Sequence, residues 1–308
     1  MTRHWPWLVL LLALVPAGVL VAGLLAPWWW QGDLAVHWLP LPTVAIVLAA
    51  AALARRMPRV AGGLVLLIGI VAFDQWPHFW RARAPSTGTG PSLQVAHANL
   101  CFPVDGAARR AALARALDGD PEVVSLVEAD QRRDGDACSK ERWPYQIWVA
   151  QTRWSPHDRI ALLSRHPILQ HRTSGSPQQP FLVAELSVMG QPLTVIVLHP
   201  PAPHTPAMAQ LRREQLREVA AAVADSAGPT LALGDFNDTT RSPWWSPLTE
   251  AGLLTPAWEP ATWPAVLGPV GITIDHILGR DLAIAPPRVI DLAGSDHRGL
   301  ATTVTFLP

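Results

Sequence analysis

The chain has 308 residues, of which 16% are charged, and its 24 basic residues balance its 24 acidic ones. This length allows one large domain or two ordinary ones, and the positive mean hydropathy of +0.19 is unusual for a purely soluble enzyme. Residues 1–84 carry a net charge of +4 and the remainder carries −4, so the larger part has no basic excess for gripping long nucleic acids.

The first 84 residues are predicted to be a transmembrane region of about three helices. An uncharged apolar run from Leu8 to Ala26 is bracketed by tryptophans, which collect at both interfaces of a bilayer. Weaker apolar runs cover about 38–54 and 60–73. Two spans plus a re-entrant piece is the alternative count. A cleaved signal peptide is the alternative for the first run, but no cleavage site in a polar context follows it.

The arginines predict the orientation of these spans. Arg3 precedes the first run, Arg55, Arg56 and Arg59 lie between the second and third runs, and the loop between the first two has no basic residue. Because positive loops stay in the cytoplasm, we expect the N-terminus inside and, after three spans, the rest of the chain outside. Arg81 and Arg83, which follow the third run, count against this orientation.

A linker rich in Pro, Gly, Ser and Thr, residues 85–91, leads to a domain expected over residues 92–308. Several predicted strands follow one another directly, so two packed mixed sheets with outer helices fit better than a doubly wound parallel sheet. Helices are expected at 105–120, with Asp105 as the N-cap, and at 206–225. Strands are expected at 93–99, 122–130, 145–151, 159–164, 181–188, 193–200, 230–235, 273–279 and 300–306.

Polar side chains gather where these strands end. We expect them to share one cleft if the strand ends converge on one rim of the domain. Carboxylates and amides without thiolates suit Mg²⁺ or Mn²⁺, and an imidazole can hold a phosphoryl oxygen or act as acid or base near pH 7. No G-x-S-x-G motif indicates acyl transfer through a serine. The set comprises Asn99, Glu128, His199, Asp235, Asn237, Asp275, Asp296 and His297.

Any one of these residues alone is more often structural, but their order is specific. The chain carries HANL (97–100), SLVEAD (125–130), RIALLSRHPI (159–168), VLHPPAP (197–203), LGDFNDT (233–239), TWP (262–264), IDHIL (274–278) and SDHRGL (295–300). This series resembles the endonuclease/exonuclease/phosphatase superfamily, the fold of DNase I, abasic-site endonucleases and neutral sphingomyelinases. With the preceding spans, the chain is similar to a membrane-anchored bacterial branch that includes teicoplanin-resistance-type proteins.

The resemblance implies a four-layered α/β sandwich and a divalent cofactor, Mg²⁺ with Mn²⁺ as the alternative. Glu128 would be the main metal ligand, with Asn99 and Asp296 nearby. Asp235 would orient or deprotonate the attacking water, and Asn237 would hold the phosphate. His297 would contact the phosphate in the transition state with Asp275 behind it, and His199 would be the second histidine on the phosphate side. His276 is expected to face away from the site.

The implied activity is hydrolysis of a phosphodiester, phosphomonoester or pyrophosphate bond. A nearby membrane and the −4 charge favour a lipid or isoprenoid-linked phosphate over nucleic acid as the substrate. Trp244, Trp245, Trp258 and Trp263 are expected to form an apolar lip or, alternatively, to pack in the core. An extracytoplasmic nuclease and a non-catalytic membrane protein on this fold are the alternative functions. The expected location is the bacterial inner membrane, with the catalytic domain extracytoplasmic.

The cysteine count is uninformative about the fold. Cys101 and Cys138 are too few for a disulfide framework. One bridge in an oxidising compartment and two unrelated thiols are both open interpretations.

Overall fold

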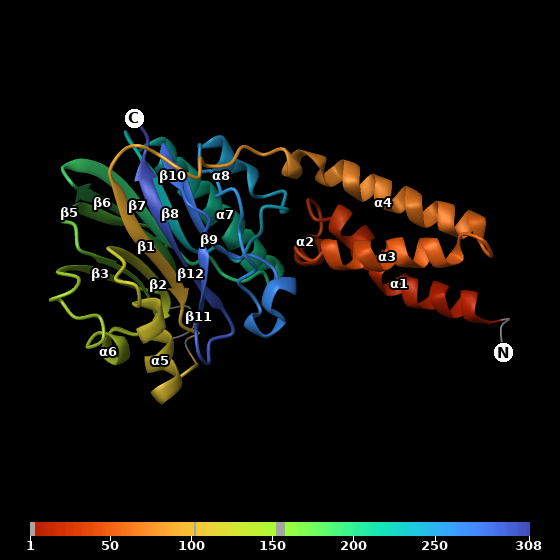
Figure 1. Cartoon of the computed structure of the whole chain (residues 1–308), viewed down its shortest axis with the longest axis horizontal. Coiled ribbons are helices and arrows are strands. Elements are labelled where there is room, and N and C mark those ends of the chain that lie inside the picture. The colour runs from red at the N-terminus through yellow and green to blue at the C-terminus, as the bar shows by residue number, and fades with distance from the viewer. Residues whose placement is uncertain (1–3, 102, 152–157) are drawn as a thin grey trace. The chain divides into compact units, whose positions relative to one another are not determined.

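The computed structural model describes residues 4–101, 103–151 and 158–308. The chain forms two compact units (Figure 1). The first contains the residues up to 81 together with 203–209 and 239–245, and the second contains 82–202, 210–238 and 246–308. The second unit holds every residue that the sequence suggests for catalysis.

Four helices form the N-terminal part of the first unit. Two of them, α1 and α4, are long and apolar enough to cross a membrane. The second predicted run corresponds to α3, which meets α2 at 74° near Pro40, a residue that supplies no N–H for a continuous helix. With its 14 residues, α3 alone is short for a bilayer about 30 Å thick. The bounds are α1 (Trp5–Leu24), α2 (Trp30–Val36), α3 (Pro40–Leu53) and α4 (Pro58–Phe79).

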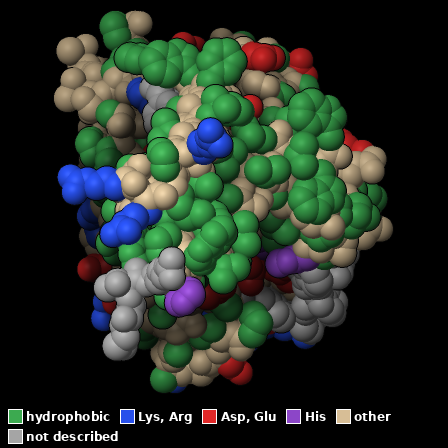
Figure 2. Space-filling view, turned by 90° about the vertical axis from the view of Figure 1, so that its right-hand side faces the viewer, with side chains coloured by type: hydrophobic (Ala, Val, Ile, Leu, Met, Phe, Trp, Pro, Cys, Tyr) green, Lys and Arg blue, Asp and Glu red, His purple; other side chains and the backbone are tan. Residues whose placement is uncertain are grey.

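The helices pack on one another through small and branched apolar residues, and Leu20, Ile46 and Val71 are buried between them. Most of their other large apolar side chains are exposed, including Leu12, Val15 and Phe73. Figure 2 accordingly shows hydrophobic side chains predominating on the face that it presents, which is seen from the side of these helices. Such an exposed apolar surface is what a bilayer would cover.

The second unit contains two mixed sheets, as the sequence predicts. The seven-stranded sheet has the order β10-β12-β1-β2-β4-β3 with β11 paired to β12, and the five-stranded sheet has the order β5-β6-β7-β8-β9. Within them, β1 and β2 are parallel and so are β7 and β8. The bounds in the first sheet are β1 (Ser92–Asn99), β2 (Val123–Ala129), β3 (Tyr145–Ala150), β4 (Arg159–Ser164), β10 (Leu282–Ile284), β11 (Arg288–Asp291) and β12 (Arg298–Phe306).

The second sheet contains β5 (Ile168–Ser176), β6 (Gln179–Val188), β7 (Gln191–Leu198), β8 (Thr230–Asp235) and β9 (Asp275–Arg280). Strands β5, β10 and β11 were not predicted from the sequence. A long polar edge strand such as β5 has mostly exposed side chains and no apolar alternation to reveal it. The helices are α5 (Gly106–Ala116), α6 (Gln131–Asp134), α7 (Pro206–Ala224) and α8 (Ser246–Glu250), with a 3₁₀ helix η1 (Ala265–Val270).

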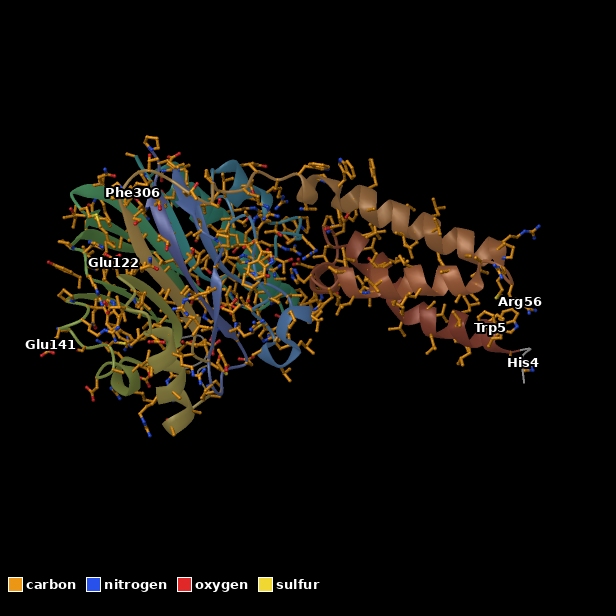
Figure 3. All side chains as sticks on the ribbon, in the orientation of Figure 1. His4, Trp5, Arg56, Glu122, Glu141 and Phe306 are labelled. Carbon is orange, nitrogen blue, oxygen red and sulfur yellow. The ribbon has the colours of Figure 1, made fainter. Side chains whose placement is uncertain are left out.

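The main core lies between the two sheets. Alternate residues of β1 illustrate this: Leu93 and Val95 belong to the core between the sheets, whereas Ala96 and Ala98 belong to the core that also contains Leu113 of α5. At the other end of the chain, Phe306 of β12 also belongs to the core between the sheets (Figure 3). The helix α7 buries Leu216, Val219 and Val223. The predicted arrangement of two packed sheets flanked by helices is therefore confirmed.

Candidate active site

Strand alternation places the catalytic candidates at one end of the core between the sheets. Val95 of β1, Val197 of β7, Leu233 of β8 and Ile277 of β9 all belong to that core. Because side chains alternate with a period of two, the residues two or four positions away at the strand ends face the same way. Those residues are His97, Asn99, His199, Asp235 and Asp275, and all five are buried.

Asn99 joins two of the carboxylates. Its Nδ2 donates to Glu128 Oε1 and to Asp235 Oδ2, both at 3.0 Å. Its Oδ1 accepts from the backbone N of Cys101 at 2.9 Å. The amide therefore presents nitrogen to the carboxylates, and direct metal ligation through Oδ1 would require the amide to rotate and lose the bond from Cys101.

Asp235 lies at the centre of the cluster and is 1% exposed. Its Oδ1 accepts from the backbone N of Asn237 at 2.8 Å. Its Oδ2 lies 3.7 Å from Nε2 of both His199 and His297. Burial and the charge of Asp275 raise the pKa of Asp235 to about 6, against the opposing effect of the two histidines. A carboxylate with this environment can accept a proton near neutral pH.

His297 and Asp275 form a close pair, with Nδ1 and Oδ2 separated by 2.8 Å. Burial opposes ionisation of the ring, but the carboxylates of Asp275 and Asp235 raise the pKa of His297 well above its usual range. Burial likewise opposes ionisation of Asp275, but the charge of His297 and the hydrogen bonds from His297 and His97 lower the pKa of this carboxyl. The pair thus keeps a proton on His297, whose Nε2 faces Asp235.

His199 is oriented by a residue that the sequence analysis did not single out. Gln151 Oε1 lies 3.2 Å from His199 Nδ1, and Gln151 Nε2 donates to the backbone O of His199 at 3.2 Å. The opposite ring nitrogen, Nε2, lies 3.8 Å from Glu128 Oε1. Gln151 is the last residue of a predicted strand and carries no local motif, so only the tertiary fold reveals its role.

The turn after β8 brings Asn237 to the backbone near His199, where its Nδ2 donates to Pro200 O at 3.0 Å. Asn237 has a left-handed φ of 47°, which asparagine tolerates better than most residues. Gly234 allows this approach, because a Cβ at that position would lie 2.0 Å from Leu198 O. Phe236 and His276 point to the other face and stack edge to face at 5.2 Å, as the alternation predicts.

Asp296 lies at the exposed rim of the site. Its Oδ2 accepts from Trp263 Nε1 at 3.0 Å, and its backbone O accepts from Ala265 N at 2.7 Å. Burial, followed by hydrogen bonding to Asp296, raises the pKa of the nearby Cys101 thiol to about 11. Cys101 and Cys138 are free cysteines, so the one bridge considered from the sequence is not formed.

The tryptophans expected to form an apolar lip or to pack in the core differ in their exposure. Trp245 is 1% exposed and belongs to the packed interior, whereas Trp258 is 57% exposed. Trp263 is half-buried and holds Asp296.

A break in β2 directs Glu128 into the site. The pairing of β2 with β4 shifts register between Leu126 and Ala129, and Glu128 has a left-handed φ of 51°. Ala129 packs in the core between the sheet and α5, which is the side on which strict alternation would place Glu128. Bulges of this kind redirect side chains beside active sites. Asp158 lies close enough for the charge of Glu128, after burial, to raise its pKa to about 8.

The buried Arg109 holds this break in place. Its Nη2 donates to Glu128 O at 2.9 Å and to Asp134 Oδ2 at 2.7 Å. Its Nη1 donates to Cys101 O at 3.4 Å, so one guanidinium joins the ends of β1 and β2. Both Cys101 and Glu128 have positive φ angles, which need such external support.

Arg109→Met is therefore expected to lower the free energy of unfolding by about 3–5 kcal/mol, because it leaves Asp134 buried without its counter-charge. Urea denaturation followed by tryptophan fluorescence would measure the loss. Arg110→Met, at the exposed neighbouring position, is the matched control and should change stability by less than about 0.5 kcal/mol. Equal losses in the two variants would contradict the role given to Arg109.

The donor set fits a divalent cation. Asp235, Asp275 and His297 can each offer an atom, and these atoms lie within 4.8 Å of one another. Asp275 already engages an imidazole with Oδ2, whereas the Glu128 side chain is 23% exposed beside the buried Asp235. An accessible carboxylate next to a buried one, with no thiolate between them, suits a hard ion such as Mg²⁺.

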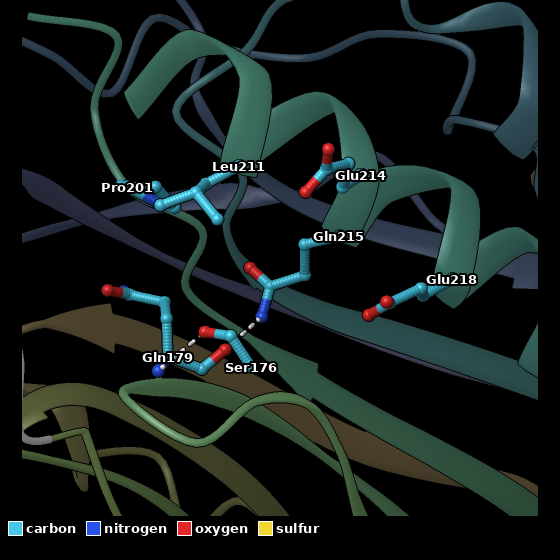
Figure 4. A pocket seen from close by; sticks show the side chains of 7 residues that line it. All are labelled: Ser176, Gln179, Pro201, Leu211, Glu214, Gln215 and Glu218. Carbon is cyan, nitrogen blue, oxygen red and sulfur yellow. Dashed lines mark hydrogen bonds between the residues drawn. The ribbon is translucent and has the colours of Figure 1, made fainter. Parts of the chain in front are cut away.

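The pocket in Figure 4 is separate from this cluster. Its cavity volume is about 30 Å³, enough for a water molecule rather than a substrate. Gln179, one of its lining residues, donates through its side-chain amide to the backbone O of His199. Gln179 therefore holds the backbone of the site, although the pocket that it lines is not part of the site.

Comparisons with known proteins show the same fold. Three solved structures share the fold at low sequence identity: a D. rerio TDP2 humanized by 14 mutations (17% identity, TM-score 0.55), sphingomyelinase C from Streptomyces griseocarneus (20%, 0.53) and the human nocturnin catalytic domain with bound sulfate (16%, 0.54). The matches cover 70%, 69% and 75% of this chain, respectively, and 99% of each of those chains. No curated protein matches the chain. The pattern of one family matches residues 96–297, and the chain therefore belongs to the Endonuclease/Exonuclease/phosphatase family.

Proposed function

We propose that this protein is a divalent-metal-dependent phosphoesterase that hydrolyses the phosphoester or pyrophosphate bond of a lipid or isoprenoid-linked phosphate. The observation that carries the proposal is the convergence of two imidazoles on one buried carboxylate oxygen, with Nε2 of His199 and of His297 each 3.7 Å from Asp235 Oδ2. A proton acceptor between two cationic or donor groups is suited to activating water beside a phosphoryl group.

Each side chain of the site has its own role in the proposed reaction. Asp235 accepts the proton of the attacking water, and the bond from Asn237 N fixes the orientation of its carboxylate. His297 and His199 donate to the phosphoryl oxygens, where negative charge develops in the transition state. Glu128 would be the main ligand of Mg²⁺ or Mn²⁺, with Asn99 and Asp296 nearby. The bound ion would polarise the phosphoryl oxygen and neutralise its charge.

An exposed apolar loop beside the site supports a lipid substrate. The η1 helix follows Trp263, and its first residue, Ala265, is bonded to Asp296. Val266 in this helix is 89% exposed, and Leu267 and Val270 are exposed as well. Apolar side chains exposed together beside a site mark an interaction surface, and an acyl or prenyl chain fits this composition.

The helical unit supports a membrane location. Trp5 and Arg56 lie at the same end of it, as Figure 3 labels them. Arg55 and Arg59 are close in sequence to Arg56, and basic residues at one end favour the cytoplasmic side. We therefore propose a multi-pass protein of the bacterial inner membrane, with the catalytic unit outside the cytoplasm. A signal from a reporter that works only in the cytoplasm, fused after Pro308, would contradict this orientation.

A substrate panel tests the activity. The full chain in detergent should release phosphate or a phosphorylated head group from phospholipids or isoprenoid pyrophosphates in Mg²⁺, and EDTA should abolish the release. Release that persists in EDTA would remove the metal mechanism. Cleavage of DNA alone would replace the lipid proposal with a nuclease, against which the −4 charge of residues 85–308 argues.

The apolar loop gives a second test. The double change Val266→Ser and Leu267→Ser should raise KM for a lipid substrate in vesicles by about tenfold, since burying each side chain contributes up to about 1.5–3 kcal/mol. Hydrolysis of a short water-soluble phosphodiester should be unchanged. The control is Leu169→Ser, at an exposed position on β5. An equal loss on both substrates would show that the loop does not contact the lipid chain.

A further inference from the structure

We propose that His97 is a positioning residue that fixes the carboxylate of Asp275 and, through it, the ring of His297. This inference rests on the proposed phosphoesterase function and adds a residue that neither the family's motif roles nor the cluster around Asp235 includes. His97 lies on β1 two residues before Asn99, with its side chain 0% exposed.

Both ring nitrogens of His97 have partners. Its Nδ1 lies 3.1 Å from Ser125 Oγ on the neighbouring strand β2, and its Nε2 lies 3.1 Å from Asp275 Oδ1 on β9. A carboxylate accepts only from a protonated nitrogen, so Nε2 carries a hydrogen. Nδ1 then accepts from the hydroxyl of Ser125 when the ring is neutral. The ring is thus held from the first sheet and reaches across the core to the second.

Asp275 is consequently held at both oxygens by imidazoles. Oδ1 accepts from His97, and Oδ2 accepts from Nδ1 of His297 at 2.8 Å. With one partner, the carboxylate could turn about its Cβ–Cγ bond while keeping a bond to His297. With two partners on opposite oxygens, its plane is fixed. This leaves Asp275 as an orienting group rather than a metal ligand, although its atoms lie near those of Asp235.

The fixed carboxylate determines where His297 points. With Nδ1 bonded to Asp275, its Nε2 is directed at the site, 3.7 Å from Asp235 Oδ2 and 3.4 Å from Asn99 Nδ2. His297 precedes β12 and its backbone N donates to Ser295 Oγ at 3.1 Å, which holds the main chain but not the ring. The ring orientation therefore depends on Asp275, and that of Asp275 depends on His97.

The kinetic test uses the full chain in detergent with Mg²⁺ and the substrate that wild type hydrolyses. His97→Ala should lower kcat by about 10–100-fold, the range for residues that orient catalytic ligands, with KM within about threefold of wild type. His97→Gln, whose side-chain amide keeps a hydrogen-bond donor, should have a kcat at least fivefold higher than that of His97→Ala. In the Asp275→Asn background, His97→Ala should cost less than twofold.

A control variant and melting temperatures separate positioning from stability. His166→Ala removes a partly buried histidine just after β4, whose Nε2 lies 3.2 Å from Glu122 Oε1 rather than in the site, and it should leave kcat unchanged. Melting temperatures of all variants should be compared. A kcat within twofold of wild type for His97→Ala would overturn the proposal. So would equal losses in the wild-type and Asp275→Asn backgrounds, or a loss that the glutamine does not reduce.

A spectroscopic readout keeps the test independent of turnover. In ¹⁵N-histidine-labelled protein, the low-field Nδ1 proton of His297, assigned by its loss in His297→Gln, should shift in His97→Ala and stay in place in His166→Ala. An unshifted signal would overturn the role of His97. Wild type that hydrolyses none of the phosphoesters would instead overturn the proposed function, and the spectrum would still decide whether His97 holds the pair.

Discussion

Replacing Asp235 with asparagine is expected to lower kcat by about 10²–10⁴-fold at saturating Mg²⁺, the usual contribution of a positioned general base. Asparagine has nearly the same shape, and its Oδ1 can still accept from Asn237 N. The change removes the proton acceptor and the negative charge between His199 and His297. Initial rates across a range of substrate concentrations would measure kcat and KM separately.

Asp281→Asn is the matched control for this change. Asp281 is an exposed carboxylate in the turn between β9 and β10, with its side chain 69% exposed. It undergoes the same chemical replacement without touching the site, so kcat should stay within about twofold of wild type. A loss below tenfold for Asp235→Asn would assign water activation to another group.

The dependence of activity on pH is a second test of Asp235 as the proton acceptor. Burial and the charge of Asp275 raise the pKa of Asp235 to about 6, and the reaction needs its unprotonated form. Activity should therefore rise between about pH 5 and 7 as Asp235 loses its proton. The raised pKa of His297 keeps this ring protonated in the same range, so its loss of a proton should limit activity only at alkaline pH. Asp235→Asn should lack the acidic limb.

Strand alternation made much of this site predictable from the sequence. His199, Asp235 and Asp275 follow apolar strands in phase with core residues such as Val197, Leu233 and Ile277. A period of two therefore assigns them to the inner face without knowledge of the fold. The same reasoning assigned His276 to the outer face, where it contacts Phe236.

Departures from that alternation were not predictable. Glu128 faces the site only because β2 breaks its register and the backbone at Glu128 is left-handed. The residues that stabilise this conformation are distant in sequence: Arg109 reaches Glu128 O from α5, and Gln151 reaches His199 across 48 residues. Such partners depend on tertiary packing, and no local pattern encodes them.

The helical region shows a similar limit. Hydropathy identified three apolar runs, and two of them are single long helices. The middle run, about 38–54, corresponds to α3, and the preceding helix α2 meets α3 at 74°. A hydropathy window averages over such a bend, so composition predicts how apolar a segment is but not whether it is straight.

Glu128→Gln is expected to change the metal requirement rather than the proton transfer. Glu128 is the more exposed of the two carboxylates that share the amide of Asn99, with its side chain 23% exposed against 2% for Asp235. It is therefore the one that an ion from solvent can reach. The Mg²⁺ concentration for half-maximal activity should rise by at least about 100-fold, because residues that only orient a ligand already contribute 10–100-fold to metal affinity.

The activities of the two carboxylate variants should thus depend differently on the metal concentration. Glu128→Gln should recover activity as Mg²⁺ or Mn²⁺ is raised, whereas Asp235→Asn should stay impaired at every metal concentration. Isothermal titration with Mn²⁺ gives a readout without turnover: binding should weaken in Glu128→Gln and remain unchanged in the control Glu141→Gln, whose carboxylate is exposed on the loop before β3. Unaltered Mn²⁺ binding in Glu128→Gln would place the ion elsewhere. The bulge at β2 would then direct Glu128 toward the substrate and not toward the metal.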